Sequence, residues 1–426
     1  MQPDVTAPDT AVGSHDAEAI IVIGAGHVGG RAALHLRALG WPGAIVLVGN
    51  EEALPYERPP LSKGVLTGDT TLAQTALASA ADYEAANVQR LVGTVSAMDR
   101  QAHTVSLSDG RSLRWHRLLL ATGGHARRLD LPGADRPGVR ALRTQADALA
   151  LAPFLREGAH LLLIGGGFIG LEVAASARSR GCAVTLVEGA PRLLGRSVPA
   201  SVAERVAALH RGHGVDLRLG VMPLAIEAGA ERAHRVSLSD GTVVEADAVV
   251  VGIGITAAVE LARAAGLGVA RGILVDARLA TTDPAIFAAG DVAEFPSPLS
   301  GQLTRQETWQ NAETQARTAA VNLLGGDEAY RSPAWFWSDQ YDHQLQVSGE
   351  PALGSHSVTR AVDDSAELHF YLADDGRLVG ASGFGPTAVV AKDLKLARTL
   401  VERGVAVDAA RLADPGVKLK SLLSGA

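Results

Sequence analysis

Residues 19–29 read AIIVIGAGHVG, and residues 161–170 read LLLIGGGFIG. Each stretch is a short aliphatic run, typical of a buried parallel strand, that ends in a glycine-rich turn. The glycines of the two turns are Gly24, Gly26 and Gly29 in the first copy and Gly165, Gly167 and Gly170 in the second. Apolar residues at helical spacing follow at 27–39 and 171–180, so each stretch predicts a strand, a tight turn and a helix.

An acidic residue completes each unit. Glu51 and Glu188 follow the next predicted strands, at 44–48 and 183–187, and lie 22 and 18 residues after the third glycine of their motifs. In a dinucleotide-binding unit the glycines let the backbone approach the pyrophosphate, and the helix N-terminus supplies N–H donors. The acid accepts hydrogen bonds from a ribose hydroxyl about 20 residues on. Tight packing of helix on strand is the alternative role for the glycines.

A second repeated element indicates an internal duplication. The hexapeptide VSLSDG occurs at 105–110 and again at 236–241, and Asp-Gly between apolar positions is a hairpin signal. A strand ending in small residues follows each copy, at 118–123 and 248–254. The sequence therefore predicts two related dinucleotide-binding domains, one of which could hold a flavin tightly while the other exchanges a nicotinamide.

The residues after the two repeated units show a different pattern of predicted strands and helices. Residues 286–291 (IFAAGD) predict one more buried strand, and a long helix is expected at 309–324. From about residue 332 aromatic and alternating segments suggest an antiparallel sheet, with helices at 389–402 and 418–423. The fold class expected is α/β, with two Rossmann-like domains and a C-terminal α+β domain.

Composition excludes several kinds of protein. The chain has 426 residues, of which 47% are hydrophobic, and a net charge of −7, so we expect neither a disordered chain nor a general attraction to nucleic acid. Its longest apolar runs fall far short of the 18 or more residues of a membrane helix. We read residues 1–17 as a disordered leader, find no signal peptide, and expect a cytoplasmic protein.

Cysteine and histidine offer no redox or metal chemistry. The single cysteine, Cys182, excludes a CxxC pair, a Cys-ligated zinc site and an iron–sulfur cluster within the chain. It begins a buried strand, so we expect it to be structural. His210 and His213 lie beside glycines with no carboxylate partner in the pattern, and we expect both at the surface. No metal site is predicted.

Six segments carry a resemblance to a known family. The chain resembles the FAD-dependent, NADH-using ferredoxin reductases of Rieske oxygenase and bacterial cytochrome P450 systems, within the glutathione-reductase-like flavoproteins. The match runs from about residue 18 to the C-terminus. The segments are 55–63 (PYERPPLSK), 121–123 (ATG), 165–172 (GGGFIGLE), 289–291 (AGD), 307–309 (ETW) and 335–340 (WFWSDQ).

The resemblance implies a function and a domain plan. NADH would pass hydride to FAD, which would then deliver single electrons to a small acidic [2Fe–2S] ferredoxin; the 307–309 segment favours a Rieske ring-hydroxylating dioxygenase over a P450 as its user. A monomer or weak dimer is expected. The expected domains are an FAD domain at 18–125 and 256–331, an NAD domain at 126–255, and a C-terminal domain at 332–426.

The resemblance also assigns roles to residues. It gives the first glycine motif to FAD and the second to NADH, and it places Lys63 near flavin N5, Glu172 beside the nicotinamide, and Trp337 where the two rings meet. The alternatives are a solvated loop lysine, a helix N-terminal charge and ordinary sheet packing. The other cofactor contacts expected are Glu51, Arg58, Val95, Thr122, Arg127, Asp291, Trp309, Ile169, Glu188, Arg192 and Gly252.

Rival functions stay open at this level. A rubredoxin reductase, an NADH oxidase and a P450-system reductase are alternative enzymes, and a flavoprotein that senses NADH by conformational change is an alternative of another class. Ferredoxin docking would need a local basic face on an acidic chain. The candidates are Arg305, Lys392, Lys395 and Arg398, the last three at helical spacing.

Overall fold

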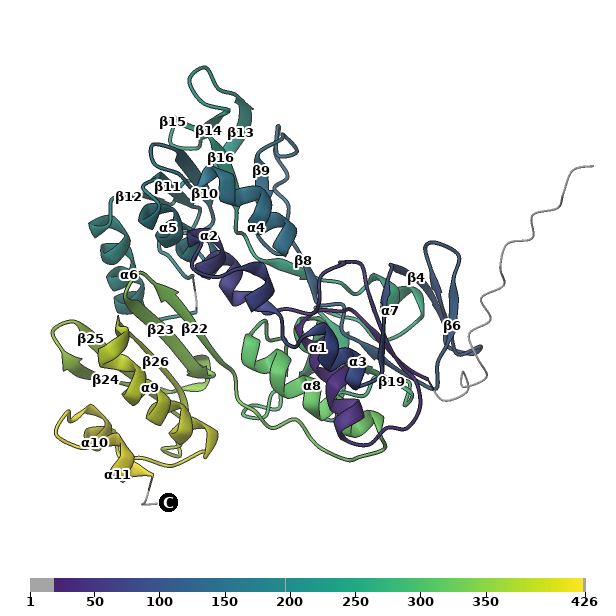
Figure 1. The fold of residues 1–426 in the computed structure, drawn as a ribbon. Coiled ribbons are helices and arrows are strands. Elements are labelled where there is room, and N and C mark those ends of the chain that lie inside the picture. The colour runs from purple at the N-terminus through teal and green to yellow at the C-terminus, as the bar shows by residue number, and fades with distance from the viewer. Residues whose placement is uncertain (1–18, 196, 424–426) are drawn as a thin grey trace, which may run out of the picture.

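The computed structural model describes residues 19–195 and 197–423, and the expected leader at 1–17 lies outside them. Three five-stranded sheets organise the described chain, two of them parallel and one antiparallel (Figure 1). This arrangement confirms the expected fold class. No helix in the described ranges is long and apolar enough to cross a membrane.

The first parallel sheet has the order β19-β7-β1-β2-β3. Its central strand is buried at all four positions, as a strand covered on both faces must be. Its last strand comes from far downstream in the chain and pairs with β7. The strands are β1 (Ile20–Ile23), β2 (Ile45–Gly49), β3 (Val88–Val92), β7 (Arg117–Leu120) and β19 (Ile286–Ala288).

Two helices cover one side of this sheet and lie against each other. They are α1 (His27–Ala38) and α8 (Trp309–Leu323). Both bury small residues, glycines and alanines in α1 and alanines in α8, so their backbones can approach closely. A short helix, α3 (Ala80–Ala85), precedes β3. Figure 1 shows α1 and α8 side by side, although 270 residues separate them in sequence.

The second parallel sheet repeats the plan, with the order β12-β11-β10-β16-β9. Its strands are β9 (Val139–Ala141), β10 (His160–Ile164), β11 (Ala183–Glu188), β12 (Val215–Leu219) and β16 (Ala248–Val251). Its helices are α4 (Gln145–Leu151), α5 (Phe168–Ser179) and α6 (Ala200–Gly212). Both glycine motifs therefore join a central strand to a helix, as the sequence predicts.

The repeated VSLSDG hexapeptides form equivalent hairpins in two small antiparallel sheets. Gly110 and Gly241 end their turns with φ of 92° and 83°, a region that favours glycine. The sheets are β4 (Val95–Asp99), β5 (Thr104–Leu107) and β6 (Ser112–Arg114), and β13 (Pro223–Ala228), β14 (His234–Leu238) and β15 (Val243–Ala246).

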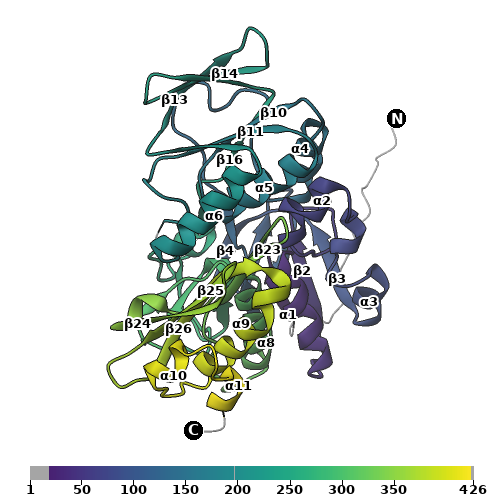
Figure 2. The same cartoon turned by 90° about the vertical axis from the view of Figure 1, so that its left-hand side faces the viewer.

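The C-terminal part is an antiparallel sheet covered by helices (Figure 2). In sheet order its strands are β22 (Trp335–Gln340), β23 (His343–Gly349), β26 (Leu378–Pro386), β25 (Ala366–Leu372) and β24 (His356–Asp363). Its helices are α9 (Thr387–Glu402), α10 (Ala409–Ala413) and α11 (Leu419–Leu422). The long helix α9 packs its buried leucines and valines on this sheet.

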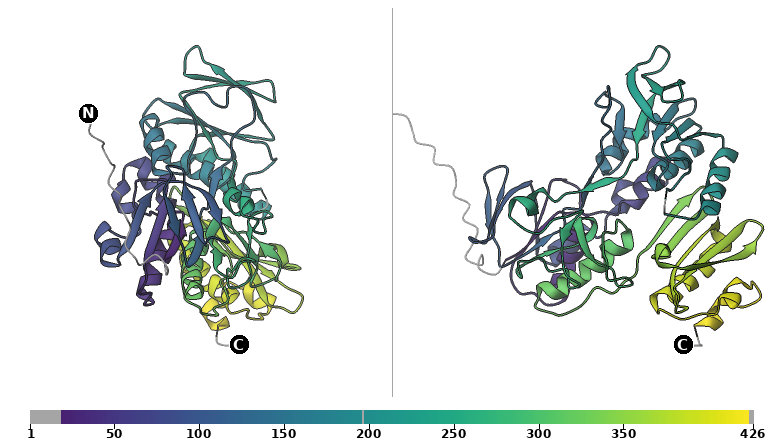
Figure 3. Two further views of the ribbon diagram at one scale, coloured as in Figure 1. Left: turned by 90° about the vertical axis from the view of Figure 1, so that its right-hand side faces the viewer. Right: turned by 180° about the vertical axis from the view of Figure 1, so that it is seen from behind.

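Two connections tie the units together. An antiparallel pair, β8 (Gly124–Ala126) and β17 (Ile255–Ala257), carries the chain into and out of the second unit (Figure 3). The segment before β3 also crosses over: Tyr56, Leu61 and Leu66 belong to the second unit's hydrophobic core, and α2 (Gly64–Thr67) contacts α5. The remaining short elements are α7 (Glu260–Ala264), β18 (Ile273–Leu274), β20 (Ala293–Pro296) and β21 (Leu303–Thr304).

Candidate active site

A cavity of about 550 Å³ lies where the three units meet. Its walls come from the first glycine turn, the segment before α2, the start of α5, the start of α8 and β22. Eleven of the residues predicted from the sequence line it: Gly24, Gly26, Glu51, Arg58, Lys63, Thr122, Ile169, Glu172, Asp291, Trp309 and Trp337. The fold thus brings together residues spread over more than 300 positions of the chain.

The first glycine motif forms an open cradle at the cavity. Gly24 has a φ of 109°, and a Cβ there would lie 2.2 Å from the carbonyl oxygen of Ala121. A Cβ on Gly29 would lie 1.9 Å from the Gly24 oxygen, so this glycine permits close packing of α1 on the strand. A Cβ on Gly26 would meet nothing closer than 3.9 Å, and α1 begins just after it. The turn therefore leaves room for a ligand at a helix N-terminus.

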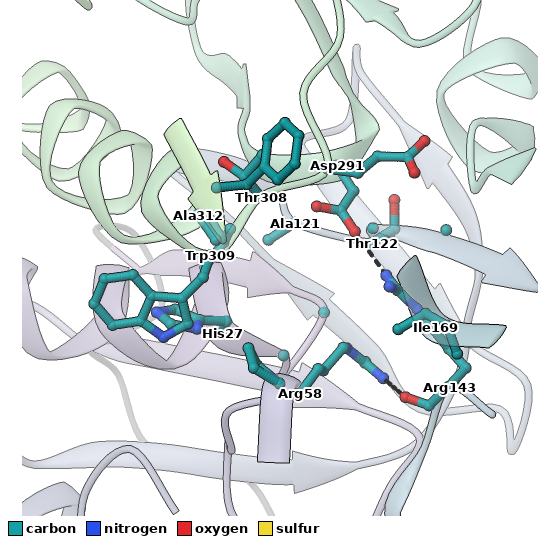
Figure 4. Close-up of a pocket in the computed structure, with 18 of the residues that line it drawn as sticks. His27, Arg58, Ala121, Thr122, Arg143, Ile169, Asp291, Thr308, Trp309 and Ala312 are labelled. Atoms are coloured by element: carbon teal, nitrogen blue, oxygen red, sulfur yellow. Dashed lines mark hydrogen bonds and ion pairs between the residues drawn. The ribbon is translucent and has the colours of Figure 1, made fainter. Parts of the chain in front are cut away.

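Two arginines lie close together on the cavity wall. Arg58 donates a hydrogen bond to the backbone oxygen of Arg143, and Arg143 pairs with the Asp291 carboxylate at 2.7 Å (Figure 4). Burial, and then the neighbouring Arg143, lower the pKa of Arg58. Guanidinium groups stay charged in proteins, so two of them beside an open glycine turn suit an anion such as a pyrophosphate.

Glu51 and Asp291 supply acceptors at two walls of the same cavity. Glu51 accepts a hydrogen bond from the Tyr56 hydroxyl at 2.7 Å and lies 3.9 Å from Arg58. The Asp291 carboxylate follows β19, and its backbone oxygen accepts from Arg305 at 3.0 Å. The Glu51 carboxylate is placed to accept hydrogen bonds from ribose hydroxyls, and the Asp291 carboxylate from the hydroxyls of a ribityl chain.

The N-terminus of α8 also faces the cavity. Thr308 caps the helix by accepting from the backbone N–H of Asn311 at 3.1 Å. Trp309, the first helical residue, donates to Glu57 at 3.2 Å and meets the His27 ring edge-on at 5.4 Å. Figure 4 shows Trp309 and His27 together at one side of the cavity. The positive end of a 15-residue helix is therefore available to an electron-rich ring.

Glu172 is a buried carboxylate with three donors. Its side chain is 5% exposed, and it accepts from Ser62 Oγ at 2.5 Å, Ser338 Oγ at 2.7 Å and Lys63 Nζ at 3.3 Å. Burial raises the pKa of this carboxyl, while Lys63 and the two hydroxyls act in the opposite direction. A buried charge needs such partners, so Glu172 is more than a helix N-terminal charge.

Lys63 connects this carboxylate to the aromatic wall. Its Nζ lies 3.3 Å from Glu172, 3.5 Å from Asp339 and 5.9 Å from the centre of the Trp337 ring. Trp337 in turn packs against Trp335 at 5.0 Å and meets Trp309 edge-on at 6.0 Å. The lysine is therefore held in place and is not a solvated loop residue.

The second glycine motif repeats the first geometry. Gly165 has a φ of 108°, and a Cβ there would lie 2.5 Å from the Gly252 oxygen, whereas one on Gly167 would meet nothing closer than 4.0 Å. A Cβ on Gly170 would lie 2.1 Å from the Gly165 oxygen. Glu188, at the end of β11, accepts from the backbone N–H groups of Gly166 at 2.6 Å and Ala190 at 2.7 Å.

Some predicted residues lie outside the lining of the large cavity. Gly29, Gly165, Gly167 and Gly170 belong to the strand–turn–helix units just described, whereas Glu188 ends β11 and Gly252 follows β16. Arg192 donates to the Val198 oxygen at 3.2 Å. Arg127 donates to the Ile255 oxygen at 3.1 Å, at the β8–β17 junction. Val95 packs against the core of the first unit from β4.

Sequence reasoning missed several residues of the site and misplaced one. Arg143 belongs to no motif, and its role comes from tertiary contacts. Phe336, Ser338, Asp339 and Gln340 surround Trp337 in the 335–340 segment, which is the signal that could have identified them. His210 was expected at the surface, and this expectation is wrong: its side chain is fully buried and contacts Gln340 Oε1 at 2.9 Å. The four-residue spacing from Val206, another buried residue of α6, is the signal that could have identified it. No cluster of metal-ligating side chains occurs among the described residues.

Comparisons with known proteins agree with this site. Residues 18–316 match the pyridine nucleotide-disulphide oxidoreductase family, and residues 335–423 match the reductase C-terminal family. The chain is 43% identical to the ferredoxin–NAD(+) reductase component of the anthranilate 1,2-dioxygenase system of Burkholderia cepacia, over 96% of this chain and 100% of that one.

Two solved structures are similar throughout. One is the ferredoxin reductase for the CYP199A2 system of Rhodopseudomonas palustris, at a TM-score of 0.89 and 36% identity over 95% of this chain and 99% of that chain. The other is putidaredoxin reductase in a covalent complex with putidaredoxin, at 0.90 and 36% over 96% and 99%. The chain therefore belongs to the pyridine nucleotide-disulphide oxidoreductase family, as an enzyme that uses FAD and NAD(H).

Proposed function

We propose that the chain is an NADH:ferredoxin reductase that passes electrons through FAD to a small acidic [2Fe–2S] ferredoxin of a Rieske ring-hydroxylating dioxygenase system. One observation carries the proposal: the first glycine turn, the start of α5 and the Lys63–Glu172 pair converge on one cavity. The chain has one cysteine, Cys182, which is buried and does not line the cavity. A mechanism that needs a pair of thiols is therefore excluded. Bound FAD supplies the coupling between a two-electron hydride step and single-electron delivery.

The cavity residues fit FAD as its ligand. Gly24 and Gly26 would admit the pyrophosphate at the start of α1, with Arg58 and Arg143 neutralising its charge. Glu51 would hold the adenosine ribose, Asp291 and Thr122 the ribityl end, and Trp309 the flavin ring. The open space at Gly26 and the two guanidinium groups at the cavity wall support this arrangement, because together they offer room and positive charge at one helix N-terminus.

The second unit would hold NADH. Gly165 and Gly167 would admit its pyrophosphate at the start of α5, and Glu188 would accept from its adenosine ribose. Ile169, 41% exposed at the cavity, offers an apolar surface to the nicotinamide. Since α5 also carries Glu172, the same helix would position the nicotinamide beside the flavin.

Lys63 and Glu172 would act as a charge-paired unit. The Glu172 carboxylate holds the lysine ammonium at 3.3 Å, and Asp339 restrains it from the other side at 3.5 Å. A cation fixed at the cavity wall stabilises electron density that arrives on a neighbouring ring. We propose these two residues, together with Trp337, as the catalytic residues.

A basic face on α9 would receive the acidic ferredoxin. Lys392 and Lys395 are exposed, and the Arg398 guanidinium lies 4.4 Å from the centre of the Trp335 ring, which stacks on Trp337 of the cavity wall. This surface therefore lies at the end of an aromatic row that begins at the site. Arg305 suits docking less well, because its guanidinium is 2.5 Å from Glu307 and its side chain is 16% exposed. We propose a monomer or weak dimer in the cytoplasm.

The test is reduction of cytochrome c through a purified [2Fe–2S] ferredoxin, with NADH as donor. The protein should be yellow with about one FAD per chain, and cytochrome c reduction should depend on added ferredoxin. An enzyme that consumes oxygen at the same rate with and without ferredoxin would instead be an NADH oxidase. A protein that binds NADH but turns over no one-electron acceptor would be a sensor.

A P450 system is the second candidate user of the electrons. The similarity to the ferredoxin reductase for the CYP199A2 system favours it. Comparison of KM for a Rieske-system ferredoxin and for a P450-system ferredoxin, at equal ionic strength, would separate the two uses.

A further inference from the structure

Glu172 is the end of a buried row of hydrogen bonds that crosses from β22 to α6. Ser338 Oγ contacts Glu172 Oε1 at 2.7 Å, Gln340 Nε2 contacts Ser338 Oγ at 3.2 Å, and His210 Nε2 contacts Gln340 Oε1 at 2.9 Å. The side chains of Ser338, Gln340 and His210 are fully buried. The row therefore has no access to solvent along this stretch, and its donors and acceptors must match one another.

Donor and acceptor chemistry gives the row one direction. The Gln340 amide oxygen has no hydrogen, so the proton must sit on His210 Nε2. The amide nitrogen then donates to Ser338 Oγ, which leaves the single Ser338 proton for Glu172. If the Gln340 amide rotated by half a turn, its oxygen would face Ser338 and accept the hydrogen bond from the Ser338 hydroxyl. Glu172 would then lose that hydrogen bond. The two orientations of one amide thus differ by one hydrogen bond at the buried carboxylate.

His210 is suited to selecting one orientation. Burial lowers its pKa to about 4, so it is neutral at physiological pH and carries one ring proton. Its other nitrogen, Nδ1, faces the Tyr341 hydroxyl at 3.5 Å, and burial keeps the pKa of that hydroxyl above its usual range. A hydroxyl that retains its proton can donate to Nδ1 and so favours the Nε2–H tautomer.

We propose that His210 is a positioning residue of the active site, which fixes the Gln340 amide and the Ser338 hydroxyl so that a donor always faces the Glu172 carboxylate. The site's catalytic role for Glu172 rests on the proposed function, but the positioning itself does not. The ionised Glu172 carboxylate holds the Lys63 ammonium at the cavity. His210 does not contact the cavity and influences it only through Gln340, Ser338 and Glu172.

The charged and titratable groups around the row are few. Lys63 faces Glu172 from the segment before α2, and Asp339 of β22 faces Lys63. Tyr341 and His213 face His210, with the His213 ring stacked on Tyr341 at 3.6 Å. Arg178 of α5 donates to the His213 backbone oxygen at 2.7 Å, and its charge opposes the rise in the pKa of Tyr341 that burial causes. Among these, His213 is exposed and takes no part in the row, which makes it a matched control.

The experiment follows Glu172 itself by the 13C carboxyl signal of labelled glutamate in the full-length holoenzyme. The Glu172→Gln variant identifies the signal. His210→Phe should move its titration midpoint upward by about one pH unit, because the released amide can turn its oxygen to Ser338 and accept the proton that Ser338 donates to Glu172. Gln340→Met should leave the midpoint near the wild-type value, because methionine has no oxygen that competes for the Ser338 proton. His210→Gln, which keeps a donor near the Nε2 position, and His213→Phe should leave the midpoint near the wild-type value.

A double variant separates positioning from packing. In the Gln340→Met background, His210→Phe should cause no shift, because the amide that His210 orients is absent. The acid limb of the kcat profile for ferricyanide reduction should move with the carboxyl signal. If His210→Phe fails to fold, the smaller apolar variant His210→Leu carries the test.

Equal midpoints in wild type and His210→Phe would overturn the proposal, and so would an equal shift from His210→Phe with and without Gln340→Met. A shift in His210→Gln as large as that in His210→Phe would also overturn it, since bulk and not the donor would then be responsible. Failure to reduce ferredoxin would count against the proposed function alone, because the titration does not use ferredoxin.

Discussion

At the residue scale, we expect Glu188 to select between the two nicotinamide cofactors. Its carboxylate lies at the end of β11, held by two backbone N–H groups, where it would repel a 2′-phosphate. Arg192, the nearest cation in sequence, donates to the Val198 oxygen. We expect kcat/KM to be higher for NADH than for NADPH. Glu188→Ala should lower that ratio by on the order of tenfold, since it removes a like charge at close range. A ratio at or below one in the wild type would show that Glu188 has another role.

Cys182 gives a second prediction for a single side chain. It is fully buried, its thiol lies 3.3 Å from the Arg156 oxygen, and burial raises its pKa. We expect slow reaction of the native protein with a thiol reagent and fast reaction in urea. Cys182→Ser should keep most NADH–ferricyanide activity, because a hydroxyl can make the same hydrogen bond and no thiol lies at the cavity. Loss of activity in a folded, FAD-loaded variant would contradict the dithiol-free mechanism.

Residues were predictable from sequence where a local pattern required them. Gly24 and Gly165 follow from the motif, because their φ values and close contacts exclude side chains. Ser338 and Gln340 lie in the 335–340 segment that carries the resemblance, but their contacts were not predictable, since their partners lie 166 and 130 positions away. His210 was misplaced because its neighbouring glycines suggested a turn, whereas the residue forms part of the last turn of α6.

At the element scale, the contact between α1 and α8 is held by a charged cluster. Glu313 accepts from His27 Nε2 at 2.8 Å and from Arg31 Nε at 2.9 Å. The hydrogen bond from His27 is the largest cause that lowers the Glu313 pKa. A carboxyl whose pKa is lowered on folding contributes stability above its unfolded value, and that stability is lost as pH falls through the folded value.

Glu313→Gln should therefore lower the free energy of unfolding by about 1 kcal/mol at pH 7. The difference between variant and wild type should shrink below about pH 4.5, the ordinary value for a glutamate. Urea denaturation at several pH values measures it. Glu84→Gln, at an exposed position of α3, is the control, and an equal loss in both variants would remove the role given to the cluster.

The helix α9 carries the prediction on partner binding. Lys392→Glu with Lys395→Glu should raise KM for ferredoxin, leave KM for NADH unchanged, and weaken the dependence of ferredoxin reduction on salt. Lys420→Glu with Lys418→Glu, at α11, makes the same change in net charge and is the control. Unchanged KM for ferredoxin in the α9 variant would place the docking surface elsewhere.

At the scale of the whole molecule, cofactor removal should loosen the first unit. The cavity draws its walls from all three units, so a flavin bound there would contact each of them. Ligand that binds only the folded state stabilises it by RT ln(1 + [L]/Kd), about 4 kcal/mol at a thousandfold excess over Kd. The Tm of the apoprotein should therefore lie several degrees below that of the holoenzyme and recover on addition of FAD. Equal Tm values would show that the cavity does not bind FAD.

The duplicated plan was predictable at this scale, because two copies of strand, turn, helix and hairpin recur in the same order. The crossing segment was not. Tyr56, Leu61 and Leu66 precede β3 in sequence, yet their burial depends on α5 and α4 of the other unit. The sequence does not show which unit buries these three side chains. The hydrophobic effect is non-directional, and any apolar surface within reach can bury them.

That crossing segment constrains how such a protein can evolve. A genetic exchange with a relative at position 125, between the two halves, would separate Tyr56, Leu61 and Leu66 from the side chains that they contact. The hybrid would inherit mismatched shapes at a buried joint, at a cost of about 1–3 kcal/mol for each poorly fitting side chain. Exchange of the second unit should therefore cost least stability when the segment before β3 is inherited with it.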